Sequence, residues 1–165
     1  MKFMRNDGWY NGYTWKEREA KLKALKNRIS KGDHLLPHPP CDLCGDPNVF
    51  VEYHDEDYSQ PYIWGPPAVF VLCRSCHRDK IHKRFLRPST WFAFLAHVRR
   101  GGYSSDLKNP AIKKEVLNYQ AAIDRGEQAS LMLLRPYKKE IFKEWFAVLS
   151  VDLKTLTSSS ARPRP

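Results

Sequence analysis

Two segments of the chain decide its fold: CDLCG at residues 41–45 and LCRSCHRDKIH at residues 72–82. Each contains a Cys-x-x-Cys pair, and 28 residues separate Cys44 from Cys73. A Cys-x-x-Cys pair forms a tight turn that presents two thiolates to one ion, and two such turns complete a closed tetrahedral zinc site. The gap exceeds that of a usual zinc ribbon, so we expect an enlarged hairpin between the pairs. The predicted ligands of a structural Zn²⁺ are Cys41, Cys44, Cys73 and Cys76.

Four cysteines can also form two disulfides, and the cellular compartment decides between the two outcomes. The chain has no run of 18 or more apolar residues and no charged leader followed by an apolar segment. We therefore expect neither a membrane span nor a signal peptide, and a cytoplasmic location. Cytosolic thiols stay reduced, so the paired spacing favours a metal over disulfides.

The chain is basic, with 28 Lys and Arg against 18 Asp and Glu in 165 residues and a formal net charge of +10. A basic surface attracts phosphate backbones and releases the counterions condensed on them. Many small proteins are basic for solubility alone, so charge by itself leaves nucleic-acid binding and a solvated surface as equal alternatives.

The residues between and after the cysteine pairs predict two strands and a helix. NVFVEYH (48–54) and AVFVLC (68–73) are rich in β-branched and aromatic residues, which is typical of strands. The proline-containing stretch SQPYIWGPP (59–67) predicts a long loop between them. CRSCHRDKIHKRF (73–85) predicts a short helix that ends near Pro88.

Helical patterns fill the rest of the chain. From Thr14 to Lys31 an apolar stripe accompanies many Lys and Arg, with Thr14 as the cap. Further apolar stripes predict helices around residues 91–98, 112–123 and 137–153, whose apolar side chains we expect in a core or on a partner surface. The stripes are Trp15, Leu22, Leu25 and Ile29; Trp91, Phe94, Leu95 and Val98; Ile112, Val116, Tyr119 and Ile123; and Ile141, Phe142, Trp145, Phe146 and Leu149.

These patterns predict an α+β protein with a small strand–strand–helix centre surrounded by helices. The expected organisation is an N-terminal arm and basic helix at 1–33, the zinc-containing module at 34–88, a helical region packed on it at 89–156, and a disordered polar tail at 157–165.

Three histidines near the cysteine pairs need a role of their own, because four cysteines saturate one zinc ion. In a regular helix His77 and His82 lie five residues apart, about 140° around the axis, which disfavours their binding one ion together. His77, at the start of the helix, is better placed to meet His54 at the end of the first strand. Beside Asp55, Glu56 and Asp57 this pair would hold a divalent ion; the alternative is that His54 belongs to an acidic, solvated loop.

The layout of these motifs resembles a known family. A C-x-x-C pair, a strand, a His within HDEDYSQP (54–61), a second strand and LCRSCH (72–77) is similar to the cysteine-rich HNH endonucleases of the ββα-metal fold. The resemblance covers residues 41–85. It implies that the cysteines bind structural zinc and that hairpin and helix hold one catalytic divalent metal for cutting DNA. It further implies that His54 and His77 are ligands of that metal, which such donors allow to be Mg²⁺, Mn²⁺, Ni²⁺ or Zn²⁺.

Two positions depart from the family pattern. The family's second histidine, its general base, directly follows the first and falls here on Asp55, and the family's Asn has no counterpart near Ala68. An ordinary Asp, with a pKa of about 3.9, is a weak base, and a nearby cation makes it a better ligand than base. Three interpretations stay open. His54 is the base while Asp55 and His77 bind the metal; Asp55 or a bound water acts more slowly; or catalysis has been lost.

The function expected from these residues is metal-dependent hydrolysis of DNA with low intrinsic sequence specificity. The expected partner is DNA, with RNA as the alternative. Basic residues beside the helix are expected to clamp the phosphate backbone. They are Arg74, Arg78, Lys80, Lys83 and Arg84. Two alternatives remain: a noncatalytic zinc-bound module that binds nucleic acid, and a subunit that docks into a larger complex through its C-terminal helices.

Overall fold

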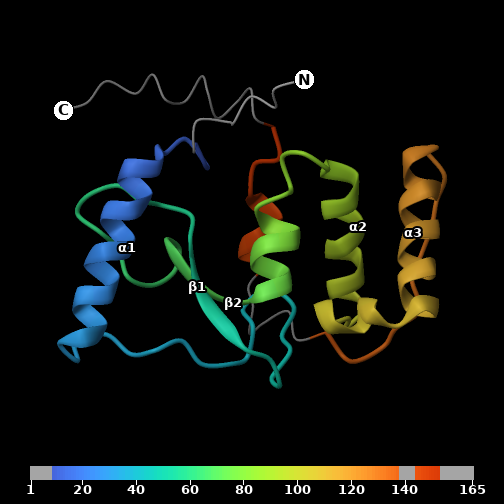
Figure 1. Cartoon of the computed structure of the whole chain (residues 1–165). Helices are drawn as coiled ribbons and strands as arrows, with labels where there is room; N and C mark the ends of the chain where they lie inside the picture. Colours follow the sequence, from blue (N-terminus) through green and yellow to red (C-terminus); the bar gives the residue numbers. More distant parts are fainter. Residues whose placement is uncertain (1–8, 138–143, 153–165) are drawn as a thin grey trace. The chain divides into compact units, whose positions relative to one another are not determined.

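The computed structural model describes residues 9–137 and 144–152 and confirms the mixed α+β class (Figure 1). It contains a small antiparallel sheet of two strands, β1 (Val51–Asp55) and β2 (Val69–Cys73). The helical elements are α1 (Trp15–Ser30), η1 (Ser75–Ile81), α2 (Pro88–Arg99), η2 (Ser104–Lys108), α3 (Pro110–Asp124) and η3 (Trp145–Val148). No helix within the described ranges is both long and apolar enough to cross a membrane.

The chain divides into two compact units. The first comprises residues 1–37, 53–70 and 152–165, and the second comprises residues 38–52 and 71–151. The segment 34–88, which the sequence predicts as one module, therefore contributes to both units. The predicted disordered tail lies outside the described residues.

Strand β1 begins three residues later than predicted. The carboxylate of Asp46 accepts a hydrogen bond from the backbone N–H of Asn48 at 2.9 Å, which holds these residues in a turn. Only after this turn does the chain become extended, at Val51. Strand β2 agrees with the prediction to within one residue, and it is buried along nearly all of its length.

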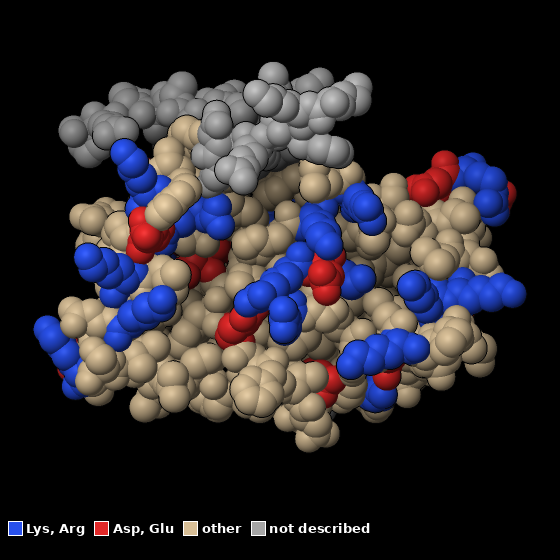
Figure 2. All heavy atoms as spheres, in the orientation of Figure 1, with Lys and Arg blue, Asp and Glu red and all other residues tan. Residues whose placement is uncertain are grey.

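Helix α1, in the first unit, has the predicted ends but not the predicted buried face. Thr14 forms a capping box with Glu17, and Gly32, with φ +79°, follows the last turn. Of the apolar stripe, Leu25 is buried, whereas Trp15 is half exposed and Lys21 is fully buried instead. The reason is that downstream acidic and aromatic residues surround the ammonium group of Lys21, as described below. Lys and Arg side chains line the rest of α1 (Figure 2).

The core of the second unit centres on α2, which packs against α3 (Figure 1). The predicted stripe of α2 is confirmed, because all four of its apolar residues are at most 3% exposed. In α3 the predicted start is confirmed: Asn109 accepts a hydrogen bond from the N–H of Ala111, and Pro110 is the first helical residue. Only Val116 of its apolar stripe is buried, so of the two expectations for this stripe, core or partner surface, the core holds for Val116 alone.

The helix predicted over 137–153 is wrong in the part that the structure describes. Residues 138–143, which include Ile141 and Phe142 of the stripe, lie outside that part. Beyond them, only the single turn η3 is helical. The left-handed backbone of Glu144 precedes η3, and the extended backbone of Leu149 follows it. Within this turn Phe146 is fully buried, so it does belong to the core.

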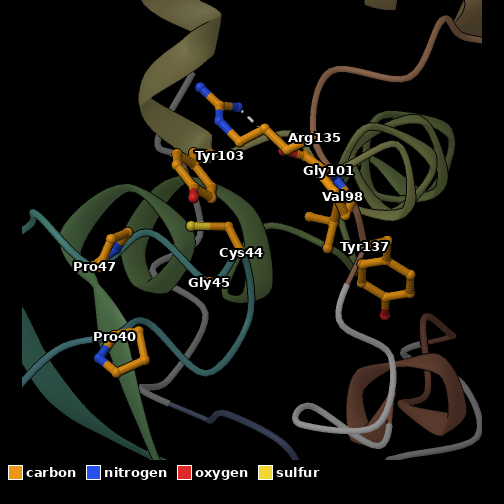
Figure 3. A pocket seen from close by; sticks show the side chains of 10 residues that line it. Pro40, Cys44, Gly45, Pro47, Val98, Gly101, Tyr103, Arg135 and Tyr137 are labelled. Carbon is orange, nitrogen blue, oxygen red and sulfur yellow. Dashed lines mark hydrogen bonds between the residues drawn. The ribbon is translucent and has the colours of Figure 1, made fainter.

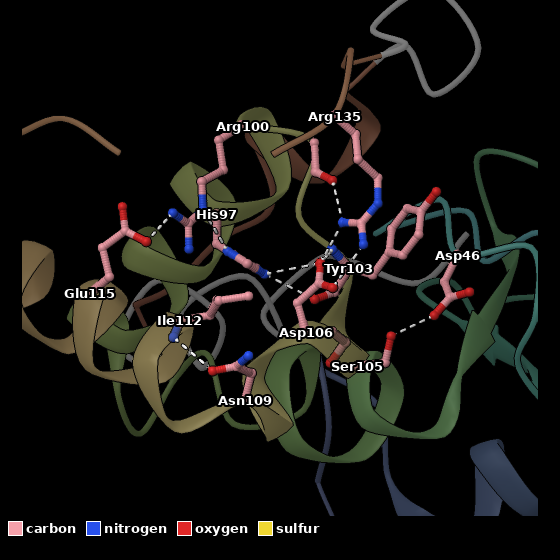
Figure 4. Close-up of polar contacts among 12 residues, drawn as sticks. Asp46, His97, Arg100, Tyr103, Ser105, Asp106, Asn109, Ile112, Glu115 and Arg135 are labelled. Atoms are coloured by element: carbon pink, nitrogen blue, oxygen red, sulfur yellow. Dashed lines mark hydrogen bonds and ion pairs between the residues drawn. The ribbon is translucent and has the colours of Figure 1, made fainter. Parts of the chain in front are cut away.

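A buried histidine ties the end of α2 to the loop that follows it (Figure 4). The Nε2–H of His97 donates to the carbonyl of Tyr103 at 2.9 Å, and Arg100 donates through Nε to His97 Nδ1 at 2.9 Å. These bonds require the neutral imidazole. Burial lowers the pKa of His97, and the positive charge of Arg100 acts in the same direction.

We predict an acid-sensitive contribution of His97 to stability. Its folded-state pKa lies below the ordinary value of 6.5, so the unfolded chain binds more protons between the two values. The contribution is complete above pH 6.5 and decreases as the pH falls. Urea unfolding from pH 7.5 to 5.5 should show the wild type losing about 1 kcal/mol more than His97→Gln. An unshifted His97 titration followed by NMR would contradict the prediction.

A second prediction concerns Gly101, which has φ +77° and passes close to a neighbouring segment. A Cβ there would overlap the backbone carbonyl oxygen of Arg135. Gly101→Ala should reduce the free energy of unfolding by about 3 kcal/mol or more, because strain and a backbone clash add. Gly32→Ala is the matched control, since φ is +79° and nothing lies within 4 Å; it should cost about 1 kcal/mol. Equal losses in chemical denaturation would contradict the proposed clash.

Candidate metal centre

The four cysteines predicted as zinc ligands come together in the second unit. Their sulfur atoms all lie within 4.8 Å of one another, and all four residues are buried. The first two lie in the loop before β1, the third ends β2, and the fourth lies in η1. None of them forms a disulfide.

The first Cys-x-x-Cys pair forms the tight turn that its sequence predicts. The N–H of Gly45 donates to the carbonyl of Cys41 at 2.8 Å, and Gly45 has φ +78°, a conformation that glycine adopts without strain. Sulfur atoms also accept backbone hydrogen bonds, from Cys73 N–H to Cys41 at 3.2 Å and from Cys76 N–H to Cys73 at 3.5 Å. Such bonds stabilise negative charge on the sulfurs and orient them.

The chemistry of the cluster fits a cation. Burial and the neighbouring cysteines raise the pKa of the Cys76 thiol well above its ordinary value, so the four thiols do not all ionise by themselves. A divalent metal removes this obstacle, because coordination deprotonates a thiol. The four-cysteine cluster can therefore hold a structural metal such as zinc, and four thiolate ligands leave no open position for catalysis.

Neighbouring elements fix both cysteine pairs in place. Asp42, in the first turn, exchanges two hydrogen bonds with Val71 of β2, at 2.7 and 2.6 Å, and its carbonyl accepts from the indole of Trp145. The short helix η2 bonds beside both pairs: Ser104 donates to Ser75, between Cys73 and Cys76, and Ser105 donates to Asp46, two residues after Cys44. The sequence analysis missed this role of η2, because nothing local indicates which distant turn a serine will reach.

A small pocket borders the cysteine cluster beside Cys44 (Figure 3). Its cationic residue, Arg135, donates to the carbonyl of Gly101 at 3.1 Å, stacks over the ring of Tyr103 at 4.0 Å and forms two hydrogen bonds with Asp106. Because Arg135 is already engaged, this pocket contributes to packing rather than to a ligand site.

His54, at the end of β1 in the first unit, is buried and paired with a carboxylate. Its Nε2 lies 2.5 Å from Glu56, which also accepts hydrogen bonds from Tyr10 and Asn11. Because a carboxylate only accepts, Nε2 carries the hydrogen, and the neutral form of this ring has its lone pair on Nδ1. A carboxylate behind a histidine is the usual support of both metal ligands and general bases.

His77, in the second unit, has the same kind of support. Its Nδ1 lies 2.7 Å from Glu52, which Arg78 also binds through two nitrogens at 3.1 and 3.0 Å. Burial acts to raise the pKa of Glu52, but hydrogen bonds from Arg78 and His77 outweigh it and hold the pKa below its usual value. The ionised Glu52 therefore places the hydrogen on Nδ1 and the lone pair on Nε2 of His77. The sequence analysis did not single out Glu52 or Glu56 for these roles.

The prediction that His77 and His82 lie apart is wrong. Their ring centroids are 4.7 Å apart, and their nearest ligand atoms lie within 4.8 Å. The cause is the helix type: η1 is a π-helix, and the N–H of His82 bonds to the carbonyl of His77 five residues earlier. That wider turn brings residues five apart onto one face, whereas a regular helix separates them.

Asp55, in the first unit, forms an ion pair that the sequence analysis did not foresee. Its carboxylate lies 2.7 Å from the ammonium of Lys21, whose side chain is only 1% exposed. Lys21 also donates to the carbonyl of Asp57 at 2.6 Å, and it lies over the ring of Trp64. Asp55 therefore neutralises a buried cation, which competes with any role as base or metal ligand.

The basic residues predicted to clamp phosphate differ in availability. The prediction is wrong for Arg84, because this residue is 1% exposed and donates hydrogen bonds to the carbonyls of Ser150 and Ile81. Arg78 is exposed but bound to Glu52, and Lys83 pairs with Asp79 at 3.4 Å.

Arg74 and Lys80 are the other two predicted clamps. Arg74 is exposed. Lys80 is partly buried over the ring of Phe94, and burial lowers its pKa. Figure 2 shows basic side chains with acidic ones among them at the centre of the view, where η1 lies in Figure 1.

No family model, curated protein or solved structure matches the chain. The resemblance to HNH endonucleases therefore depends on the motifs within residues 41–85, and the ββα-metal arrangement and the catalytic metal remain predictions.

We predict one zinc ion per chain, lost on substitution of Cys76. Cys76→Ser should abolish zinc retention and the cooperative unfolding transition, because metal binding and folding are one process in such sites. Elemental analysis and circular dichroism measure the two effects. The control is Arg74→Ala, an exposed neighbour in the same segment, which should keep both zinc and fold. A zinc-free chain that unfolds cooperatively would contradict the prediction.

Proposed function

We propose that the protein is an HNH-type endonuclease that hydrolyses DNA phosphodiester bonds with one divalent metal and low intrinsic sequence specificity. The observation that carries the proposal is the support of two histidines by carboxylates, His54 by Glu56 and His77 by Glu52. A carboxylate on one ring nitrogen raises the basicity of the other, which suits both metal binding and proton abstraction.

We assign the role of general base to His54. Of the three interpretations that the sequence leaves open, we keep from the first the role of His54 as base, because the ion pair with Lys21 engages the carboxylate of Asp55. The same ion pair argues against Asp55 as a ligand of the metal. His54 would accept a proton from the attacking water at Nδ1. Glu56, on the opposite nitrogen, would then stabilise the imidazolium, as the carboxylate of a catalytic triad does.

We assign the role of metal ligand to His77, with His82 beside it on the same face of η1. When bound, a divalent cation supplies positive charge to the scissile phosphate and to the leaving 3′ oxygen. Glu52 holds the ring of His77 in the orientation and tautomer that binding requires. Arg74 is exposed and suited to neutralise a neighbouring phosphate.

The second candidate function is a noncatalytic zinc-bound module that binds nucleic acid. The ion pair between Asp55 and Lys21 favours this second candidate as well, because it gives a structural role to the residue in the position of the family's general base. Such a module would bind with a steep salt dependence and would need no added divalent metal.

We predict metal-dependent nicking of a supercoiled plasmid in Mg²⁺, Mn²⁺ or Ni²⁺. His54→Ala should slow it by about 10²- to 10⁴-fold, as expected for loss of a general base. Glu52→Gln should slow it by about 10- to 100-fold through His77, and excess metal should partly restore the rate. Asp55→Asn should slow nicking less than His54→Ala, with zinc content unchanged in all variants.

One further variant and two possible outcomes make the result decisive. His77→Ala should lose nicking while keeping zinc, which separates the second metal from the cysteine cluster. If His54→Ala and His77→Ala both cut like the wild type, the assigned site is wrong. If no metal supports cutting while zinc and salt-sensitive DNA binding are intact, the noncatalytic module is the better description.

A further inference from the structure

The second unit contains an open groove of about 610 Å³ between η1 and η2. One wall comes from the start of η1, another from η2, and the turn before β1 closes the rim. The residues that define its character are Phe50, Arg74, Asp79, Lys80, Ser105 and Lys108. This groove is separate from the cysteine cluster's interior, although Cys73 borders it.

The charge of the groove suits an anion. Arg74 and Lys108 are exposed, and neither has an acidic partner among the described residues. Asp79 is the acidic residue of the described lining, and it pairs with Lys83 at 3.4 Å. Positively charged side chains on two opposing elements attract a phosphate backbone when few acidic groups nearby neutralise them.

The aromatic residue at the rim adds a second kind of contact. Phe50 is 97% exposed, which leaves nearly all of its ring in contact with water. A single exposed apolar residue needs no explanation by itself. Beside Arg74 and Lys108, however, an exposed ring forms the combination by which proteins bind single strands: cations along the backbone and an aromatic face on which a base stacks.

We propose that this groove binds a single-stranded segment of nucleic acid, with phosphates on Arg74 and Lys108 and an unpaired base stacked on Phe50. A base inside a duplex is already stacked on both faces, so Phe50 has nothing to add there unless the duplex opens. The proposal names the form of substrate for the proposed nuclease and rests on that function for its purpose, but the binding itself requires no cleavage.

The test is fluorescence anisotropy with a labelled 16-nucleotide single strand and the matching duplex, without added divalent metal. Phe50→Leu keeps an apolar side chain but removes the ring, and it should weaken single-strand binding by about 5- to 100-fold with little effect on the duplex. Phe50→Trp should bind like the wild type. Leu86→Ala, also an exposed apolar residue of this unit at 72%, is the matched control and should change nothing.

The cations are tested through the salt dependence. Arg74→Ala combined with Lys108→Ala should reduce the slope of log K against log salt for the single strand by about 1.4, the value for two lost phosphate contacts. Lys114→Ala, an exposed lysine of α3, should reduce it less. Zinc content and circular dichroism confirm that each variant is folded.

The outcomes separate this proposal from the proposed function. Single-strand binding by Phe50→Leu at wild-type affinity overturns the stacking, and an unchanged slope in the double variant overturns the groove as the phosphate site. Equal weakening of single strand and duplex by Phe50→Leu also overturns it. A Phe50-dependent, single-strand-selective affinity in a protein that nicks nothing supports the groove and rejects the nuclease.

Discussion

The second unit depends on one constraint, the confinement of four buried sulfurs within 4.8 Å of one another. The four thiols do not all ionise in such a volume: hydrogen bonds from the neighbouring cysteines lower the pKa of Cys73, whereas burial raises the pKa of Cys76. Four thiolates without a cation would repel one another strongly. A structural metal held by this cluster would therefore contribute directly to the free energy of folding. The sulfurs join the loop before β1, the end of β2 and the start of η1. Hydrogen bonds from Ser104 and Ser105 then link η2 to the residues around the cysteine cluster.

Sequence alone predicts what depends on local pattern. The capping box of Thr14, the buried stripe of α2, the span of β2 and the cysteine ligand set all follow from spacing and residue type. Sequence analysis fails where a contact with a distant residue or an unusual backbone conformation determines the local structure. The burial of Lys21 requires acceptors more than thirty positions away, and the proximity of His77 and His82 requires the i to i+5 hydrogen bonding of η1. Neither of these two features produces a periodic pattern in the sequence.

The candidate site shows the same division. Types of residue identify His54 and His77 as candidates, but the carboxylates that fix their tautomers become visible only in the structure. Glu52 lies two residues before His54 along the chain, yet its hydrogen bond goes to His77, twenty-five positions later. Strand alternation places residues two apart along β1 on the same side, but it does not say which distant side chain each of them contacts.

The ion pair between Lys21 and Asp55 gives a physical reason for the departure from the HNH pattern. Lys21 is fully buried, and a buried ammonium without a counter-charge costs several kcal/mol. A histidine at position 55, as the family pattern has, would leave that ammonium without its carboxylate. The carboxylate at position 55 and the buried ammonium at position 21 therefore depend on each other, and the residue at position 55 is explained only together with Lys21. If the chain is an active nuclease, proton abstraction must come from another group, and His54 with Glu56 behind it is the one that the first unit offers.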